Sequence, residues 1–272
     1  MPYKWFITDV DGTLLDEANE LTSENRAALE HCKARGIPVV LATGRRWTTL
    51  KRVIDRLDLH GLVDYVIINN GMVLKNLKTM KVLHHEAFDP SAIQTVVKAL
   101  NTLGWDPLAL AYEADGGPDV YHRRLSLRNG DFTAKNDGYC VLLNDYEELE
   151  GRAVVELILL GSQAELTRAQ QALEGLPAEN AVETALIKNT FYADYMLEIT
   201  PLGVSKLTGA RRLGEHLGLT VAEAVAIGDS ANDLPLLRGA GRAVAMPEAP
   251  EDVRAGAHET GIVSDTILRY FP

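Results

Sequence analysis

The chain of 272 residues has few cysteines, fewer basic than acidic residues and no long hydrophobic run, and each shortage narrows its possible functions. Its two cysteines, Cys32 and Cys140, lie far apart and lack the spacing of a metal-binding pair, which favours a reducing, cytoplasmic compartment. The formal net charge of −11 argues against nucleic acid or an anionic membrane as a partner, since both repel an acidic surface. An anionic substrate would therefore need positively charged groups at its binding site.

Hydrophobic runs are short throughout the sequence. No stretch of about 18 uncharged apolar residues occurs, so we expect no membrane-spanning helix. The N-terminal run contains an acidic pair and no small-residue cleavage site, so we do not expect a signal peptide. Hydrophobic residues still make up 46% of the chain and charged residues 24%, a balance that predicts a globular protein with a buried core.

Apolar runs of strand length alternate with helical patterns in the first part of the sequence. The expected strands cover about residues 3–8, 37–44 and 65–71. One helix is expected to begin at Thr22 or Ser23, and another to cover about residues 47–57. Continuously apolar strands separated by helices predict an α/β fold with a doubly wound, Rossmann-like parallel sheet.

This alternation stops after about Leu83 and resumes after about Tyr195. The segment between them combines two expected helices, at about residues 91–103 and 165–173, with short strands and Gly- and Asp-containing turns. An insert that interrupts the doubly wound domain is the simplest account. We expect a core of residues 1–83 and 196–272 and a smaller, inserted α+β cap domain of residues 84–195.

The first candidate for chemistry is the run Asp9-Val10-Asp11-Gly12-Thr13, which follows the first strand. Alternate residues of an extended chain share a face, so Asp9 and Asp11 can point into one pocket, and Gly12 permits a sharp exit. Open α/β sheets bind ligands at the carboxyl ends of their strands. A simple turn is the alternative interpretation, because Asp-Gly after a strand is common.

Two further candidates have ordinary interpretations when each is taken alone. Thr43-Gly44-Arg45 follows the second strand, where a hydroxyl, free backbone N–H groups and a helix start form a natural anion site. An ordinary helix cap would show the same residues. Lys206 stands near the start of a later helix, and a lone lysine is usually a solvated surface charge.

The fourth candidate is Gly228-Asp229-Ser230-Ala231-Asn232-Asp233, directly after an apolar strand. Asp229 would stand at the strand end and Asp233 one helical turn on, so both can face one cleft. Several carboxylates at one sheet edge repel each other unless a cation lies among them. Mg²⁺ suits a site with few carboxylates, waters and a substrate phosphate, and Lys206 would add to the positive field.

The four motifs together, in this order and over the whole chain, resemble those of the haloacid-dehalogenase-like superfamily. They read D-V-D-G-T, L-A-T-G-R, a lysine in P-L-G-V-S-K, and G-D-S-A-N-D. Within the superfamily, the chain resembles the Cof-type sugar-phosphate phosphatases, which carry a large α/β cap between the second and third motifs. This resemblance implies a cap that closes over the site, excludes water and chooses the leaving group.

The resemblance also implies a role for each candidate residue. Asp9 would attack phosphorus and form an aspartyl-phosphate, and Asp11 would act as general acid and then as general base. Thr43 and Lys206 would complete the catalytic set. The residues expected to bind the phosphoryl group are Thr43, Gly44, Arg45, Lys206 and Asn232. The expected Mg²⁺ ligands are Asp9, the main-chain carbonyl of Asp11, and Asp229, with Asp233 acting largely through ordered water.

Three positions refine this resemblance. Members that act on carbon–halogen or carbon–phosphorus bonds generally lack an acid two residues past the nucleophile, so Asp11 favours phosphate-ester chemistry. Leu207 follows the lysine, where many of these phosphatases have glycine, and Met246 is followed by Pro247 where many have Gly-Asn. Because of the second difference, the substrate contacts that those phosphatases make near the cleft are a weaker guide to this chain.

The sequence therefore predicts a cytoplasmic, Mg²⁺-dependent phosphatase of a small phosphorylated metabolite such as a sugar phosphate. Two alternatives remain open at this point, a phosphomannomutase-like phosphoryl transfer and a catalytically silent phosphate-binding regulatory protein. In the cap, the polar candidates are more typical of the solvated surface than of substrate contacts. They are His122, Arg123, Arg124, Lys188 and Asn189.

Overall fold

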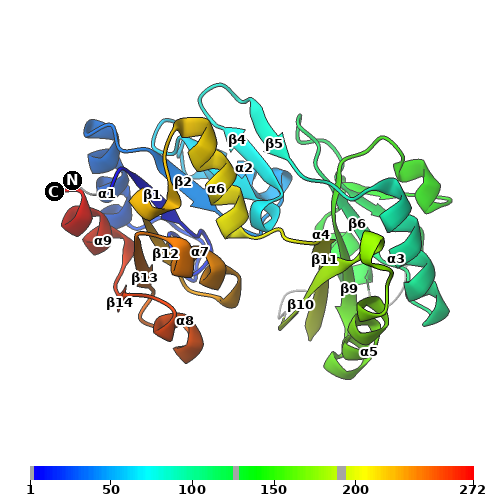
Figure 1. Cartoon of the computed structure of the whole chain (residues 1–272). Coiled ribbons are helices and arrows are strands. Elements are labelled where there is room, and N and C mark those ends of the chain that lie inside the picture. Colours follow the sequence, from blue (N-terminus) through cyan, green and yellow to red (C-terminus); the bar gives the residue numbers. More distant parts are fainter. Residues whose placement is uncertain (1–2, 125–128, 189–193) are drawn as a thin grey trace. The chain divides into compact units, whose positions relative to one another are not determined.

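The computed structural model describes residues 3–124, 129–188 and 194–272. The chain divides into two compact units, coloured along the sequence in Figure 1. Unit 1 comprises Met1–His85 and Val204–Pro272, and unit 2 comprises Glu86–Gly203. Each unit is built on a sheet of its own.

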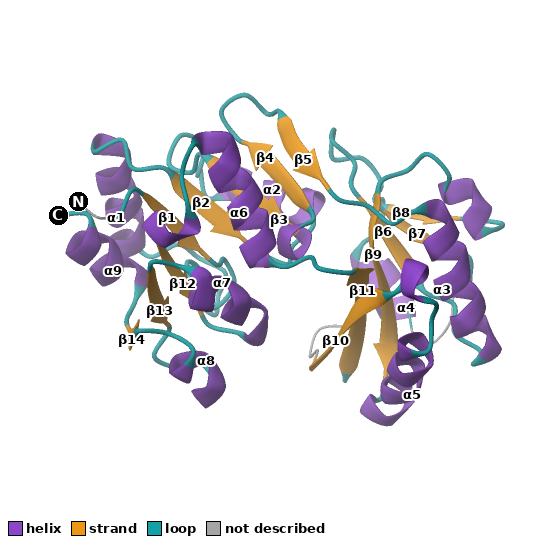
Figure 2. Ribbon diagram, viewed as in Figure 1, coloured by secondary structure: helices purple, strands orange, loops and turns teal. Residues whose placement is uncertain are grey.

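Unit 1 contains an eight-stranded sheet in the order β14-β13-β12-β1-β2-β3-β4-β5 (Figure 2). The strands are β1 Trp5–Thr8, β2 Val39–Ala42, β3 Tyr65–Ile68, β4 Val73–Asn76, β5 Val82–His85, β12 Ala224–Gly228, β13 Arg242–Ala245 and β14 Glu259–Thr260. From β14 to β3 all neighbours pair in parallel, as predicted. Strands β4 and β5 extend the sheet with antiparallel pairing, which was not expected from the sequence.

Helices cover both faces of this sheet. They are α1 Ser23–Ala34, α2 Trp47–Arg56, α6 Lys206–Leu217, α7 Leu234–Gly239, α8 Glu251–Ala255 and α9 Val263–Tyr270. On one face, buried apolar side chains of the strands form a single cluster with α6, α7 and α8. On the other face, the ring of Phe6 in β1 meets the ring of Phe271 edge to face, with centroids 6.3 Å apart. Strand β1 is therefore buried on both sides, as its continuous apolar run predicts.

Unit 2 contains a six-stranded sheet in the order β10-β11-β9-β6-β7-β8. The strands are β6 Leu108–Ala111, β7 Val120–His122, β8 Cys140–Leu142, β9 Val154–Gly161, β10 Val182–Lys188 and β11 Tyr195–Pro201. The pairing is antiparallel except between β7 and β8, so this sheet is mixed. A parallel core sheet with a second sheet in an inserted cap unit confirms the predicted fold class.

Among the described residues of unit 2, three α-helices pack on its sheet. Helices α3 (Pro90–Thr102) and α5 (Gln163–Glu174) share one hydrophobic cluster with its strands. The shorter α4 (Gly130–Lys135) places Phe132 in a second, smaller cluster. The sequence predicted α3 and α5 to within about two residues and did not predict α4. Within the described part of the chain, no helix is both long and apolar enough to cross a membrane.

The bounds of unit 2 differ from the expected insert of residues 84–195. The difference lies mainly at the C-terminal end, where the expected boundary falls inside strand β11. That strand pairs with both β9 and β10, so its hydrogen bonds belong to the sheet of unit 2. The chain returns to unit 1 only at Val204, shortly before α6.

The polar candidates of the insert differ in their surroundings. Arg124 and Lys188 are exposed, as predicted, and Arg123 forms a salt bridge within unit 2. The surface prediction is wrong for His122, which is 5% exposed, because alternate side chains of β7 point to opposite faces of the sheet and both faces are covered. Asn189 lies outside the described residues.

Candidate active site

The candidate residues gather where the central strands of unit 1 end. Strand β1 lies between β12 and β2 and runs parallel to both, with Thr8 in register with Ile227 and Leu41. Asp9, Asp229 and Thr43 directly follow these three strands. The parallel register therefore brings side chains that are far apart in the sequence to one edge of the sheet.

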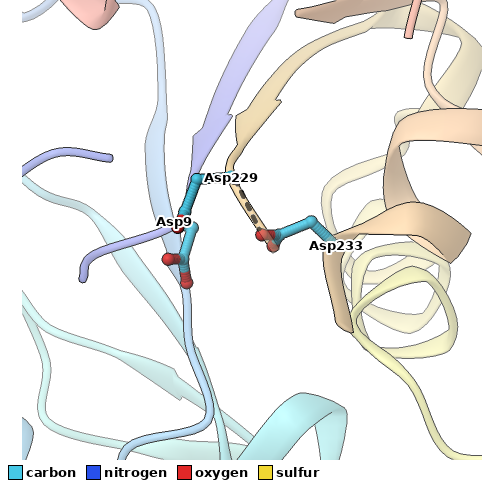
Figure 3. A group of neighbouring side chains, drawn as sticks. All are labelled: Asp9, Asp229 and Asp233. Atoms are coloured by element: carbon cyan, nitrogen blue, oxygen red, sulfur yellow. Dashed lines mark hydrogen bonds between the residues drawn. The ribbon is translucent and has the colours of Figure 1, made fainter. Parts of the chain in front are cut away.

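Three carboxylates form a cluster at this edge (Figure 3). Asp9, Asp229 and Asp233 each offer an oxygen, and these oxygens all lie within 4.8 Å of one another. Asp9 is 5% exposed and Asp233 1%, whereas Asp229 is half-buried. Because such a group of charges would repel itself in a dry interior, its stability depends on a neighbouring cation.

Lys206 supplies one such cation. Its Nζ donates to Asp9 Oδ1 at 2.5 Å and to Asp233 Oδ1 at 2.7 Å, and its side chain is 1% exposed. Ser205 caps the helix that begins at Lys206, since its Oγ accepts from the backbone N–H of Thr208 at 3.2 Å. Lys206 is thus a buried bridge between two carboxylates and not the surface charge that a lone lysine usually is.

The protonation of the cluster reflects its burial. Desolvation raises the pKa of Asp9 to about 8, against the opposing attraction of Lys206. Burial likewise raises the pKa of Asp229. For Lys206, desolvation disfavours the ammonium, but the attraction of Asp9 and Asp233 outweighs it and raises the lysine pKa. Lys206 therefore keeps its charge, and Asp9 takes up a proton readily while no metal is bound.

Backbone N–H groups and a hydroxyl group hold the side chains of Asp233 and Asp229 in place. Asp233 Oδ2 accepts from the backbone N–H groups of Asp229 at 3.1 Å, the bond drawn in Figure 3, and of Ser230 at 3.0 Å. Asp229 Oδ1 accepts from Thr13 Oγ1 at 2.9 Å. A Cβ at position 228 would lie 2.4 Å from Asp233 Cγ, so Gly228 is required for this close approach.

Asp11 lies outside the carboxylate cluster. Its side chain is exposed and forms a bidentate ion pair with Arg45, whose Nε donates to Asp11 Oδ2 at 2.7 Å and whose Nη2 donates to Asp11 Oδ1. Arg45 Nη2 also donates to Asn19 Oδ1 at 2.8 Å. Asp11 and Arg45 were both expected to act on the substrate, and in this structure they form an ion pair with each other.

The turn after β2 provides the expected hydroxyl and backbone groups. Thr43 is 1% exposed, and its Oγ1 accepts from the backbone N–H of Arg45 at 3.1 Å. Gly44 packs against the side chain of Asn70, since a Cβ at this position would lie 3.2 Å from Asn70 Oδ1. The side chain of Asn232 bonds to Asn70 as well, its Nδ2 donating to Asn70 Oδ1 at 3.1 Å.

Thr13 and Asn70 also belong to this site, although no role was expected for either from the sequence. Thr13 ends the first motif, and the bond of its hydroxyl to Asp229 joins this motif to the fourth. Asn70 belongs to the polar run Asn69-Asn70-Gly71 at the end of β3. A polar run at the carboxyl end of a third neighbouring strand was a usable signal, because ligands of such sheets bind along this edge.

The donor set suits a hard divalent cation. Three carboxylates and one ammonium leave two negative charges uncompensated when all four groups are ionised. Carboxylate oxygens are the ligands that Mg²⁺ and Ca²⁺ prefer. Asp9, Asp229 and Asp233 could therefore hold a metal ion, which would balance the remaining charge.

The chain is similar to several known proteins. YxeH of Bacillus subtilis (strain 168), named "Putative phosphatase YxeH", is 28% identical over 273 residues, covering 95% of this chain and 93% of the relative. The crystal structure of a haloacid dehalogenase-like hydrolase from Bacteroides thetaiotaomicron superposes with a TM-score of 0.80 at 24% identity, covering 99% of this chain and 100% of that one.

A second structure has a more specific description. The HAD subclass IIB sugar phosphatase BT4131 matches with a TM-score of 0.71 at 23% identity, over 96% of this chain and 94% of that one. At these identities the structural matches show the shared fold. The family model for haloacid dehalogenase-like hydrolase matches residues 6–266. The chain therefore belongs to the haloacid dehalogenase-like hydrolases.

Proposed function

We propose that this protein is a Mg²⁺-dependent phosphatase that hydrolyses a small phosphomonoester, such as a sugar phosphate or a related metabolite, through a phosphorylated Asp9. The observation that carries the proposal is the buried Lys206 bridge between Asp9 and Asp233, beside Asp229. In this arrangement the carboxylate of Asp9, the proposed nucleophile, lies next to a fixed positive charge. Lys206 thus provides a local positive charge for an anionic substrate in a chain whose net charge is −11.

The first step would transfer the phosphoryl group to the enzyme. A carboxylate oxygen of Asp9 attacks phosphorus, the bond from phosphorus to the ester oxygen breaks, and Asp11 gives its proton to the leaving oxygen. Thr43 Oγ1, the Gly44 N–H, Asn232 and the side chain of Arg45 would bind the phosphoryl oxygens. Lys206 would stabilise their charge throughout.

The second step would release inorganic phosphate. Asp11 takes a proton from a water molecule, the water oxygen bonds to phosphorus, and the bond between phosphorus and Asp9 breaks. Asp9 is regenerated as a carboxylate, so atoms and charges balance over the cycle. Arg45 donates to both oxygens of Asp11, so at least one of these hydrogen bonds would loosen when Asp11 carries the proton that it transfers.

Mg²⁺, held by Asp9, Asp229, the Asp11 main-chain carbonyl and Asp233 largely through water, would neutralise charge on the phosphate and on Asp9. Unit 2 would serve as the cap that selects the leaving group. The name of YxeH supports phosphatase activity, and the description of BT4131 supports a sugar phosphate as substrate. The cytoplasmic location expected from the sequence stays a prediction.

A substrate screen tests the proposal. Purified protein is assayed for phosphate release from sugar, nucleotide and cofactor monophosphates, with Mg²⁺ and with EDTA. We expect release from at least one small monoester in the presence of Mg²⁺ only. An isomerised sugar phosphate without free phosphate would favour phosphoryl transfer within a mutase reaction, and no turnover of any substrate would favour a silent phosphate-binding protein.

A further inference from the structure

The bend after β3 has an unusual backbone conformation. Asn69, Asn70 and Gly71 have φ values of 47°, 54° and 114°, so three successive residues lie in the left-handed region. Asparagine visits this region at a moderate cost, and glycine visits it freely. Such a bend persists only where surrounding contacts hold it, and it is common at functional sites.

The bend holds the turn that contains Thr43. The backbone N–H of Asn69 donates to the carbonyl of Arg45 at 3.1 Å, and that of Asn70 donates to the carbonyl of Thr43 at 3.0 Å. The side-chain amide of Asn70 lies against Gly44. Two backbone hydrogen bonds and one side-chain contact thus connect the bend to the anion-binding turn proposed above.

The bend also contacts the helix that carries Lys206. A Cβ at Gly71 would lie 2.1 Å from the carbonyl oxygen of Ser205, so no other residue type permits this approach. A Cβ at Gly209, one turn into α6, would lie 3.0 Å from the Cα of Gly71. The start of α6 is therefore packed directly on the bend.

A continuous chain of hydrogen bonds runs from Asn70 to Asp9. Asn70 Oδ1 accepts from Asn232 Nδ2 at 3.1 Å, and Asn232 Oδ1 accepts from Ser230 Oγ at 2.7 Å. The Ser230 N–H donates to Asp233, and Lys206 joins Asp233 to Asp9. Both ends of the Asn232 side chain are thus fixed, and its orientation depends on Asn70.

We propose that Asn70 is a positioning residue, whose side chain orients Asn232 and the Thr43–Arg45 turn for a phosphate held at this edge of the sheet. Its effect on turnover rests on the proposed function. Its effect on phosphate binding does not require turnover. The Asn70 side chain acts through its neighbours, so it is distinct from the residues that would touch the reacting atoms.

The test uses a substitution that keeps the bend. Asn70→Gly retains the left-handed backbone and its hydrogen bonds but removes the amide. We expect kcat/KM to fall about tenfold to a hundredfold, and the affinity for inorganic phosphate with Mg²⁺, measured by calorimetry, to fall about tenfold. Asp58→Gly is the matched control, because Asp58 is exposed, also has a positive φ of 46° and lies outside the site; it should match the wild type.

A double-mutant cycle with Asn232→Ala separates positioning from a general loss of structure. If Asn70 acts through Asn232, the double variant loses little more phosphate affinity than either single variant. Wild-type phosphate affinity and kcat/KM in Asn70→Gly would overturn the inference, as would fully additive losses. If the wild type hydrolyses no substrate while the phosphate-binding cycle still shows coupling, the proposed function fails and the positioning role stands.

Discussion

Two ionic arrangements occupy this site, and they differ in burial. The Lys206 side chain is 1% exposed between Asp9 and Asp233, whereas the Asp11 side chain is 49% exposed in its pair with Arg45. Removing one partner of a buried pair typically costs about 3–5 kcal/mol, while an exposed pair contributes about 0–1 kcal/mol. The first arrangement therefore holds a fixed geometry, and the second can open at little cost.

This difference matches what the proposed reaction asks of each group. The nucleophile has to stay aligned with phosphorus, and Lys206 fixes it. The acid–base group has to exchange protons with the leaving oxygen and then with water, so it needs freedom to move.

The largest effect is expected for Lys206→Met. The variant leaves the buried Asp9 and Asp233 without their ammonium partner, so the metal-free protein should lose about 3–5 kcal/mol of unfolding free energy in urea titrations at pH 9, where both carboxylates are ionised in the wild type. We expect kcat/KM to fall at least about a hundredfold, because a fixed positive charge at the phosphoryl group is lost. Lys78→Met, at an exposed position of unit 1, is the control. A loss of stability below about 1 kcal/mol would contradict the buried role.

Asp11→Asn should separate activity from stability. Loss of a general acid and base lowers kcat about 10²- to 10⁴-fold for alkyl phosphates. The unfolding free energy should change by no more than about 1 kcal/mol, because the pair with Arg45 is exposed. p-Nitrophenyl phosphate, whose leaving group needs no proton, should be affected less than an alkyl phosphate in the first step. An equal loss of that step for both substrates, measured before steady state, would argue against the role of Asp11 as an acid.

The buried cluster also predicts the pH dependence of metal binding. The pKa of Asp9 is raised to about 8, so below that pH a proton competes with the metal. The affinity for Mg²⁺, measured by calorimetry, should rise between pH 6 and 8 and level off above, with proton release on binding at the lower end. An affinity that is flat over this range would be the contrary result.

The same pKa fixes the sign of a stability change. The folded, metal-free protein keeps a proton on Asp9 up to about pH 8, whereas the unfolded chain loses it near the ordinary value of 3.8. Its contribution to stability is therefore present below about pH 4 and is lost progressively as the pH rises through 8. Asp9→Asn should remove this component, which denaturation at pH 5, 7 and 9 can measure.

The smallest effect is expected for Thr13→Val. The variant removes one hydrogen bond to Asp229 and leaves that carboxylate in place, a change of about 1 kcal/mol. The affinity for Mg²⁺ should fall only a few-fold, with kcat nearly unchanged at saturating metal. A loss as large as that of Lys206→Met would mean that Thr13 acts on the substrate.

The sequence predicted which residues meet but not how their side chains pair. Asp9 and Asp229 follow apolar strands, so parallel pairing alone brings them to one edge. The direction of Arg45 could not be predicted, because a long side chain near both Asp11 and an anion site has two favourable partners. The polar run at the end of β3 was a signal for Asn70, but its proposed positioning role also depends on a left-handed backbone that sequence patterns do not specify.

Two features of the fold differ from the expectation or were not predicted from the sequence. A turn at Leu202 and Gly203 separates the strand Tyr195–Pro201 from α6, and nothing in the local pattern of the strand tells which sheet it joins. The hairpin of β4 and β5 is short, and one of its buried residues is Lys75, which obscures the apolar pattern. Long-range pairing with β9 decides the first case, and a buried lysine in a short local hairpin explains the second.

Asp9→Asn tests the central claim most directly. The variant keeps the size of the side chain but removes its nucleophilic charge. With the best substrate from the screen and saturating Mg²⁺, the account predicts a loss of turnover of about 10⁴-fold or more, while the protein stays folded and still binds inorganic phosphate. Near wild-type turnover in this variant would contradict a phosphorylated Asp9.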